Sequence, residues 1–232
     1  DLNGELVAGG TVRHPSAAGE VSLTDGQVLI SDIGALSQVE AHLAVESLGG
    51  ASTEGIPQHR IKLVKGQAKL GEGLFEAEGS TDLLHFDEAS LLRNPVQLKV
   101  TGRRLWFPIN SSPYVTNGQF ELTAEGKGEG LVTVALKELT GNLGEGTVRA
   151  GGQLQLSSLE PVKIWSNKVQ LLAELKNASL ALGDYGSGKL TGQIGLETVF
   201  AGERPVIGGD LVVDDFQAKL GTKAEIEPAS WP

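Results

Sequence analysis

Residues 95–100 read Pro-Val-Gln-Leu-Lys-Val, and residues 119–124 read Gln-Phe-Glu-Leu-Thr-Ala. In both segments apolar and polar residues alternate, which is the period-two pattern of a half-buried β-strand. Successive side chains on a strand point to opposite faces, so the pattern predicts a sheet with one apolar and one wetted face. Antiparallel sheets commonly have such faces, whereas parallel sheets are usually buried on both sides. The two segments therefore predict an all-β fold with antiparallel strands.

The same alternation continues along most of the chain. Its apolar members are separated by Gln, Lys, Thr, Ser or Glu for the most part, so we expect them to share one face of the sheet. These positions are the candidate binding residues of the protein if that face is accessible. They are Val21, Leu23, Val96, Leu98, Val100, Phe120, Leu122, Val132, Val134, Leu154, Leu156, Val169, Leu171, Leu175, Leu190, Ile194, Leu196, Leu211 and Val213.

Turn signals fall between and within the alternating segments. Asn3-Gly4, Asp25-Gly26 and Asn117-Gly118 are dipeptides that accept positive φ, and they predict two-residue hairpin turns. Glycine accounts for 32 of the 232 residues. Its clusters, such as Gly71-Glu72-Gly73 and Gly144-Glu145-Gly146, predict further connections between strands.

Three segments are long enough to be helical, but only one favours a helix. In residues 35–48 the period-two pattern fits better than a helical one, and it predicts a strand. Residues 162–182 predict two strands with a bend near Lys176-Asn177. Residues 82–92 carry capping candidates at their start and precede Asn94-Pro95, so they predict one short helix. The expected fold is a single domain over residues 1–232, a long antiparallel-rich sheet with at most one short helix.

Composition excludes several kinds of site. The chain has no cysteine, so zinc-thiolate sites, iron-sulfur ligation and thiol nucleophiles are impossible. The formal charge is −10, and the longest basic run is Arg103-Arg104, so nucleic acid is not an expected partner. No run approaches 18 apolar residues, which excludes a membrane-spanning helix within these residues. The chain opens at Asp1-Leu2 without methionine, and we interpret it as a segment excised from a longer protein.

No catalytic or cofactor motif stands out. The four histidines, at positions 14, 42, 59 and 85, are scattered without the spacing of a metal site, and no nucleotide-binding glycine loop opens a helix. We expect neither enzymatic activity nor a cofactor. A carbohydrate-active enzyme that uses separated acids such as Glu121 and Asp184 is the less favoured alternative.

The apolar face itself is the remaining candidate site. In a closed sandwich or solenoid it would be a packed core, and the protein would be a structural or adhesive module of the cell surface. If the sheet curls without closing, the face becomes an open trough, and an exposed apolar surface of that size usually marks a binding site. Aromatic residues are only 5% of the chain, so the lining is mostly aliphatic, as acyl chains require.

Two segments of the sequence are similar to motifs of a known protein family. The first motif resembles one that recurs in the C-terminal region of TamB-like proteins, and it consists of Gly10, Pro15, Gly19, Val21, Leu23, Asp25-Gly26 and Val28. TamB-like proteins belong to the AsmA-like group of bridge-like lipid-transfer and translocation-and-assembly proteins. Residues 202–213, with Gly202, Pro205 and Gly208-Gly209 before an alternating run, resemble a second copy. The resemblance covers nearly the whole chain, although its motifs consist of common strand and turn residues.

The resemblance implies a fold, a location and partners. The expected fold is a long curved sheet, or β-taco, with an open groove and an apolar inner face. The parent chain would be anchored in the inner membrane and cross the periplasm of a bacterial cell envelope. Its partners would be phospholipid and an outer-membrane protein of the BamA type, with roles in outer-membrane assembly, protein secretion and lipid transport. The groove would hold either phospholipid acyl chains or strands of an outer-membrane protein. The family has no catalytic residues to transfer, so only the apolar lining carries over.

Overall fold

The computed structural model describes residues 1–11, 14–30, 34–51, 57–84, 88–108, 114–159, 167–181, 186–198 and 204–218. Within them the chain forms one twelve-stranded sheet whose spatial order follows the sequence from β1 to β12, with every neighbouring pair antiparallel. The strands are β1 Leu2–Thr11, β2 His14–Ile30, β3 Gly34–Ala51, β4 Pro57–Leu70, β5 Gly73–Leu83, β6 Pro95–Pro108, β7 Tyr114–Lys127, β8 Val132–Leu143, β9 Gly146–Leu156, β10 Lys168–Ala181, β11 Gly186–Glu197 and β12 Val206–Ala218.

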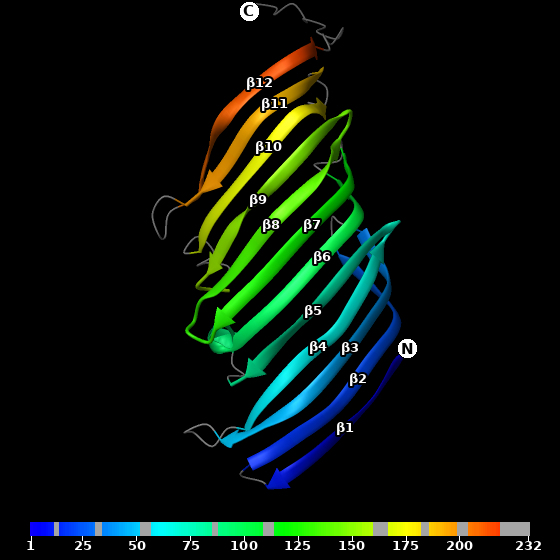
Figure 1. Ribbon diagram of the computed structural model, residues 1–232, viewed down its shortest axis with the longest axis vertical. Coiled ribbons are helices and arrows are strands. Elements are labelled where there is room, and N and C mark those ends of the chain that lie inside the picture. Colours follow the sequence, from blue (N-terminus) through cyan, green and yellow to red (C-terminus); the bar gives the residue numbers. More distant parts are fainter. Residues whose placement is uncertain are drawn as a thin grey trace, which may run out of the picture.

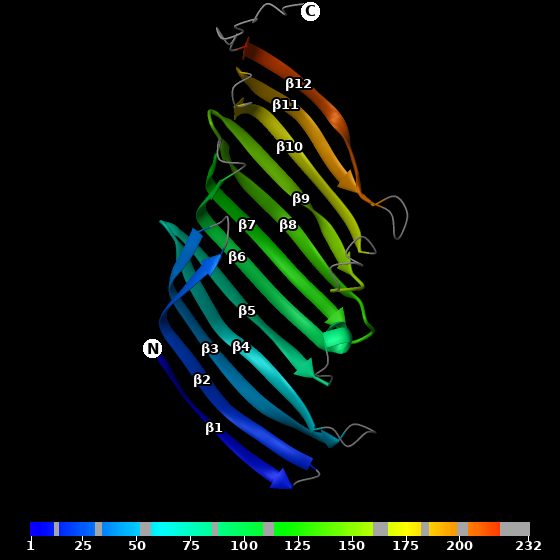
Figure 2. The ribbon, with the colours of Figure 1, turned by 180° about the vertical axis from the view of Figure 1, so that it is seen from behind.

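The sheet is open and curved. β1 and β12 lie at opposite ends of the molecule and do not pair, so the strands form a long bent ribbon rather than a barrel (Figure 1). The view from behind shows the same single layer, with strands that bend along their length (Figure 2). The expected all-β, antiparallel, open sheet is confirmed. Residues 35–48 lie in β3, as the alternation predicts.

The short helix expected over residues 82–92 is a 3-10 helix, η1, at Glu88–Arg93. Strand β5 extends to Leu83, so the first residues of the expected helix are extended instead. The segment ends before Pro95, as predicted, because proline cannot donate a backbone hydrogen bond to a continuing helix. No other helix occurs in the described ranges, and no helix there is long and apolar enough to cross a membrane.

The expected hairpin turns at the glycine dipeptides are wrong. Asn3-Gly4, Asp25-Gly26 and Asn117-Gly118 lie inside β1, β2 and β7. Asp25 and Asn117 have φ of 53° and 52°, whereas the glycine that follows each has no positive φ. A type I′ turn needs positive φ at both central residues, so the sites at Asp25 and Asn117 form β-bulges, where one extra residue bends the strand, whereas Asn3-Gly4 is regular strand.

Bulges of this kind recur across the sheet. Among the described residues, six that are not glycine have positive φ, and each lies at a shift in strand register. Such bulges increase local twist and bend the strand, which gives the sheet its curvature. In β10 the bulge at Asn177 bends one continuous strand, at the position where the sequence predicts a bend between two strands. The six residues are Asp25, Gln38, Arg104, Asn117, Asn177 and Asp215.

The small core lies where the strands bend. Val115, Leu143, Leu175 and Ala178 form a buried cluster, against which Val148, Leu190 and Ile194 pack. In β6, Leu105 is the only large side chain that is fully buried among the described residues. The chain exposes 15844 Å² of surface, where a compact monomer of 24.3 kDa would expose about 10,000 Å². Burial is therefore concentrated near the bend, with a few further buried residues such as Val132 and Asn94 toward one end of the strands, and the sheet as a whole is a thin layer.

Candidate functional site

Strand register aligns one row of twelve positions across the whole sheet, of which ten carry aliphatic side chains and two, Gly66 and Gly152, are glycines. Each member lies directly opposite the next on the neighbouring strand, so all twelve point to the same face. We call this set the apolar row. It consists of Leu2, Leu23, Ala41, Gly66, Ala77, Val100, Leu122, Leu136, Gly152, Leu171, Leu196 and Ile207.

All nineteen residues named from the sequence lie on the face of the apolar row. A second row runs parallel to it through Val21, Leu98, Val134, Leu154 and Val169. A third contains Val96, Val132 and Leu156, and the bend contributes Phe120, Leu175, Leu190 and Ile194. At the β12 end, Leu211 and Val213 continue the face opposite Gly192 and Leu190. The structure thus brings the predicted positions together, whereas their role in binding remains a prediction.

The sequence analysis missed the part of this face that β3 and β4 supply. Leu43 pairs with Leu63, and Val45 pairs with Ile61, between β2 and β5. Their omission has a clear cause, because bulges in β3 and β4 interrupt the regular alternation. In β3 the signal was nevertheless visible, since Val39, Ala41, Leu43 and Val45 alternate with polar residues.

Most of the apolar face is accessible. The described residues form a single sheet with one short 3-10 helix, so no second layer covers the face in that part of the chain. Exposure is greatest at the ends, where Leu2 is 75% and Ile207 is 74% exposed. In the middle strands the apolar side chains are half-buried by their neighbours within the sheet. The expected open groove with an apolar inner face is confirmed as a structural feature.

The opposite face is polar and held by ion pairs between strands. The guanidinium of Arg60 binds Asp82 through two hydrogen bonds, Nε to Oδ1 at 2.6 Å and Nη2 to Oδ2 at 2.9 Å. The hydrogen bonds from Arg60 hold the pKa of Asp82 below its ordinary value. Farther along the face, Arg149 pairs with Glu138 at 2.9 Å. Such exposed pairs contribute little stability individually, and each of these two joins neighbouring strands.

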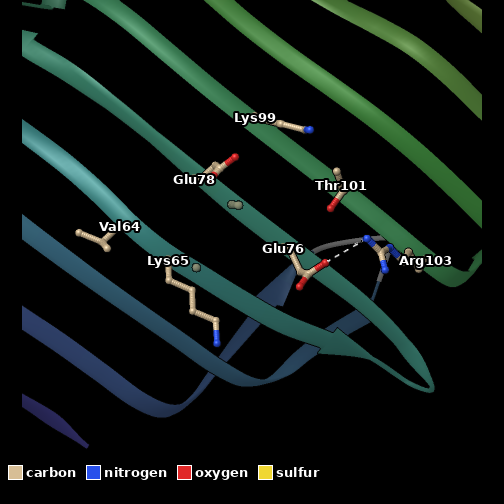
Figure 3. Close-up of a pocket in the computed structure, with 9 residues that line it drawn as sticks. Val64, Lys65, Glu76, Glu78, Lys99, Thr101 and Arg103 are labelled. Atoms are coloured by element: carbon tan, nitrogen blue, oxygen red, sulfur yellow. Dashed lines mark ion pairs between the residues drawn. The ribbon is translucent and has the colours of Figure 1, made fainter.

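The polar face also carries a shallow depression of about 270 Å³ over β4, β5 and β6 (Figure 3). Lys65, Glu76, Glu78, Lys99 and Arg103 project from its walls, and Arg103 pairs with Glu76 at 3.7 Å. Three cationic and two acidic side chains therefore lie around the depression, and Lys99 is also neutralised by its ion pair with Glu121. This arrangement gives no concentrated charge for an anionic or cationic ligand.

Glu121, one of the two candidate catalytic acids, belongs to this ion-pair network. Lys137 donates a hydrogen bond to its Oε1 at 2.7 Å, and the ammonium of Lys99 lies 3.5 Å from its Oε2. The hydrogen bond from Lys137, together with both charges, lowers the pKa of Glu121. A general acid near neutral pH requires the opposite shift, so the arrangement does not favour that role. Asp184 lies outside the described residues.

Two buried asparagines fix loops at one end of the strands. Asn94 accepts a hydrogen bond from the backbone N–H of Leu84 at 2.8 Å, which closes the loop between β5 and β6. The side chain of Asn167 accepts from the N–H groups of Ser157 and Ser158 and donates to the carbonyl of Ser158. Sequence analysis missed both, although Asn-x-Val-Gln-Leu occurs at residues 94–98 and again at 167–171.

No group of acidic or histidine side chains in the described ranges is arranged to hold a metal ion. No protein-family model matches the sequence, and neither a curated protein nor a solved structure shows significant similarity to it. The function therefore has to be argued from the sheet and its two faces.

Proposed function

We propose that the protein is a non-enzymatic segment that holds phospholipid acyl chains on the apolar face of its open sheet. The observation that carries the proposal is the apolar row, which extends from Leu2 in β1 to Ile207 in β12 with aliphatic side chains on ten of the twelve strands. A sealed sandwich core would place a second layer on this face, and the described residues form only one. The TamB-like resemblance points to the same use of such a face.

The length of the row suits a lipid path rather than a pocket for one small ligand. Eleven spacings between twelve strands, at about 4.8 Å each, give a path of about 53 Å. One leaflet of a bilayer has a hydrocarbon thickness of about 15 Å, half of the usual 30 Å core. The row is thus more than three times as long as one acyl chain. A chain can shift along it and contact aliphatic side chains of the row on ten of the twelve strands.

The chemistry of the face favours an aliphatic guest. Among the nineteen predicted lining residues only Phe120 is aromatic, and the others are Val, Leu or Ile. Burying one methylene group contributes about 0.8 kcal/mol, so sixteen carbons covered on one side only would contribute about 6 kcal/mol before binding entropy is subtracted. Such binding needs no directional contact, and we therefore expect low selectivity among saturated chains.

A polar block in the groove tests the proposal. The variant Leu98→Asp with Leu171→Asp places one carboxylate on each of β6 and β10, outside the buried cluster. Ile194 is a poorer choice because it packs against that cluster. The matched control is Gln97→Asp with Gln170→Asp, which makes the same charge change one residue away on the polar face.

Lipid extraction and native mass spectrometry of the purified proteins give the readout. We expect phospholipid to co-purify with the original protein and with the polar-face control, and to fall at least tenfold in the groove variant, because covering a charge without a partner is strongly unfavourable. Circular dichroism and thermal melting should show all three proteins folded. Equal lipid in all three proteins, or none in any, would disprove the proposal. Unfolding of the groove variant alone would favour a sealed core.

The wider setting is also part of the proposal. A bacterial periplasmic location, a parent chain anchored in the inner membrane and a partner of the BamA type are implied by the TamB-like resemblance. A segment of this kind would serve outer-membrane assembly, protein secretion or lipid transport as one stretch of a longer apolar path. Detection of the full-length parent in a fractionated bacterial envelope, together with its crosslinked partners, would test this setting.

A further inference from the structure

The two ends of the sheet carry the same arrangement of paired strands. β11 and β12 repeat the register of β1 and β2 over eight successive pairs, with a shift of 188 residues in the first strand and 190 in the second. The sequences agree as well, since residues 2–6 read Leu-Asn-Gly-Glu-Leu and residues 190–194 read Leu-Thr-Gly-Gln-Ile. The end of the sheet at β12 therefore repeats the beginning at β1.

Backbone geometry supports the equivalence of β2 and β12. Gly19 has a φ of 150° and Gly209 has a φ of 147°, and a Cβ at either glycine would overlap a carbonyl oxygen of the preceding strand. Farther along the two strands, Asp25 and Asp215 both have a φ of 53°, and both lie at a β-bulge. β12 is therefore equivalent to β2 in its backbone as well as in its register.

The outer edge of β2 is occupied, whereas the outer edge of β12 is free in the described part of the chain. β3 pairs antiparallel with β2, but no described strand pairs with the far side of β12, which ends the ribbon (Figure 1). In β2, Val21 and Leu23 are half-buried. Their equivalents in β12, Leu211 and Val213, are 40% and 52% exposed. An edge strand with exposed apolar side chains is a template for pairing with another strand.

The pairing of β3 with β2 indicates which side chains would fit a strand on β12. On the apolar face, β3 supplies Leu43 and Ala41. On the polar face it supplies His42, whose Nε2 lies 3.5 Å from a carboxylate oxygen of Glu20. The equivalent of Glu20 in β12 is Asp210, so a lysine or arginine at the position of His42 would reach it. A fitting strand therefore has alternate aliphatic residues with basic residues between them.

The charge of the two free edges argues against a second copy of this chain as the occupant. β12 contains three aspartates and no basic residue, and β1, at the other end of the sheet, contains Glu5 and no basic residue. No ion pair holds Asp210 or Asp214 among the described residues. Like charges on facing strands destabilise their pairing, whereas opposite charges stabilise it. The acidic edge thus favours a basic strand from a different polypeptide.

We propose that the free edge of β12 binds a basic β-strand of another polypeptide, antiparallel and in the register that β3 adopts on β2. The strand would continue the sheet through backbone hydrogen bonds, with aliphatic residues opposite Leu211 and Val213 and a basic residue within reach of Asp210. Backbone pairing gives such a complex its affinity, and the alternating side chains give it selectivity. The inference concerns the edge of the sheet and does not depend on the acyl-chain proposal.

Binding of a labelled peptide, measured by fluorescence anisotropy, tests the inference. The probe has the sequence of residues 39–47 with Glu40→Lys, His42→Lys and Ala44→Lys, so that its polar face is basic. Two further peptides carry N-methyl groups at positions 41, 43 and 45 or at positions 40, 42 and 44. Successive N–H groups of a strand point to opposite sides, and a strand on a free edge uses one side only. One N-methylated peptide should therefore bind, and the other should not.

Two protein variants locate the binding site. The edge variant is Asp210→Lys with Asp214→Lys. The matched control is Glu72→Lys with Glu129→Lys, which makes the same charge change at exposed positions between strands in the middle of the sheet. The probe should bind the original protein and the control equally. Its affinity for the edge variant should fall about tenfold or more, because attractive charge pairs become repulsive.

Several results would overturn the inference. They are the absence of probe binding, equal effects of the two N-methylated peptides, and equal loss of affinity in both protein variants. Dimerisation of the protein that the probe competes, measured by analytical ultracentrifugation, would assign the edge to a second copy instead. Binding that requires removal of residues 219–232 would assign the edge to that segment and would likewise overturn the inference. Lipid co-purification, measured separately, would still decide the acyl-chain proposal.

Discussion

Replacing Leu105 with alanine should destabilise the protein by about 3 kcal/mol. Leu105 is fully buried in β6, next to the bulge at Arg104. A Cβ at Gly73 would lie 2.7 Å from its Cδ2, and a Cβ at Gly102 would meet its Cδ1. The leucine therefore fills space above two glycines. Removing three carbon groups loses about 2.4 kcal/mol of transfer free energy, and the remaining cavity adds to that loss.

A double-mutant cycle with Gly102 makes the prediction sharper. Gly102→Ala alone should destabilise the protein by about 1–3 kcal/mol, because its methyl group would overlap Leu105 and the ring of Phe120. In the double variant the new methyl group occupies space vacated by the leucine. The combined loss should therefore be smaller than the sum by about 1 kcal/mol or more, although the overlap with Phe120 remains.

Urea unfolding, followed by circular dichroism, gives the four free energies of unfolding. The slope of free energy against urea should be the same for all four proteins, because it reports the surface exposed on unfolding. If the two single variants lower the free energy of unfolding by amounts whose sum equals the double variant's decrease to within about 0.4 kcal/mol, the result would contradict the contact between Leu105 and Gly102. If Leu105→Ala lowers the free energy of unfolding by less than about 1 kcal/mol, the bend has no packed core at this point.

Three further outcomes are expected. Because the pKa of Asp82 is lowered in the folded protein, its pair with Arg60 stabilises the fold fully above the ordinary aspartate pKa of 3.8. This contribution disappears as pH falls through the lowered pKa. The melting temperature of Asp82→Asn should therefore fall less between neutral and acid pH than that of the original protein. Asn167→Ala should lower the free energy of unfolding by about 1–3 kcal/mol and speed hydrogen exchange at the amide of Ser157, which donates to the Asn167 side chain. Unchanged exchange at Ser157 would contradict this hydrogen bond. Gln38→Gly should raise the free energy of unfolding in urea by up to about 1 kcal/mol, because glycine adopts the φ of 49° at this position without steric strain. A lower free energy of unfolding would argue against that backbone conformation.

The sequence predicted which residues share a face but not how the chain turns. Alternation at positions such as Leu98 and Leu122 follows from the local geometry of a strand, so it could be interpreted without tertiary information. The dipeptides Asp25-Gly26 and Asn117-Gly118 misled the analysis, since positive φ serves a hairpin turn and a β-bulge equally well. Only pairing with the neighbouring strand decides between the two.

The hydrogen bonds by which Asn94 and Asn167 fix their loops could not be predicted from the sequence either. Asn94 and Asn167 each lie just before a strand, where a polar residue usually means an ordinary turn. Their repeated Asn-x-Val-Gln-Leu context was the available signal, at a spacing of 73 residues.

The amino-acid sequence by itself determined that this protein is a β-sheet with one aliphatic and one polar face, because side-chain alternation is a property of each strand. Whether that aliphatic face would be sealed or open was decided only by the tertiary structure. Closure depends on how far the bulges bend each strand and on whether the first strand meets the last. In this protein β1 and β12 remain at opposite ends of the ribbon, and the apolar row between them stays accessible.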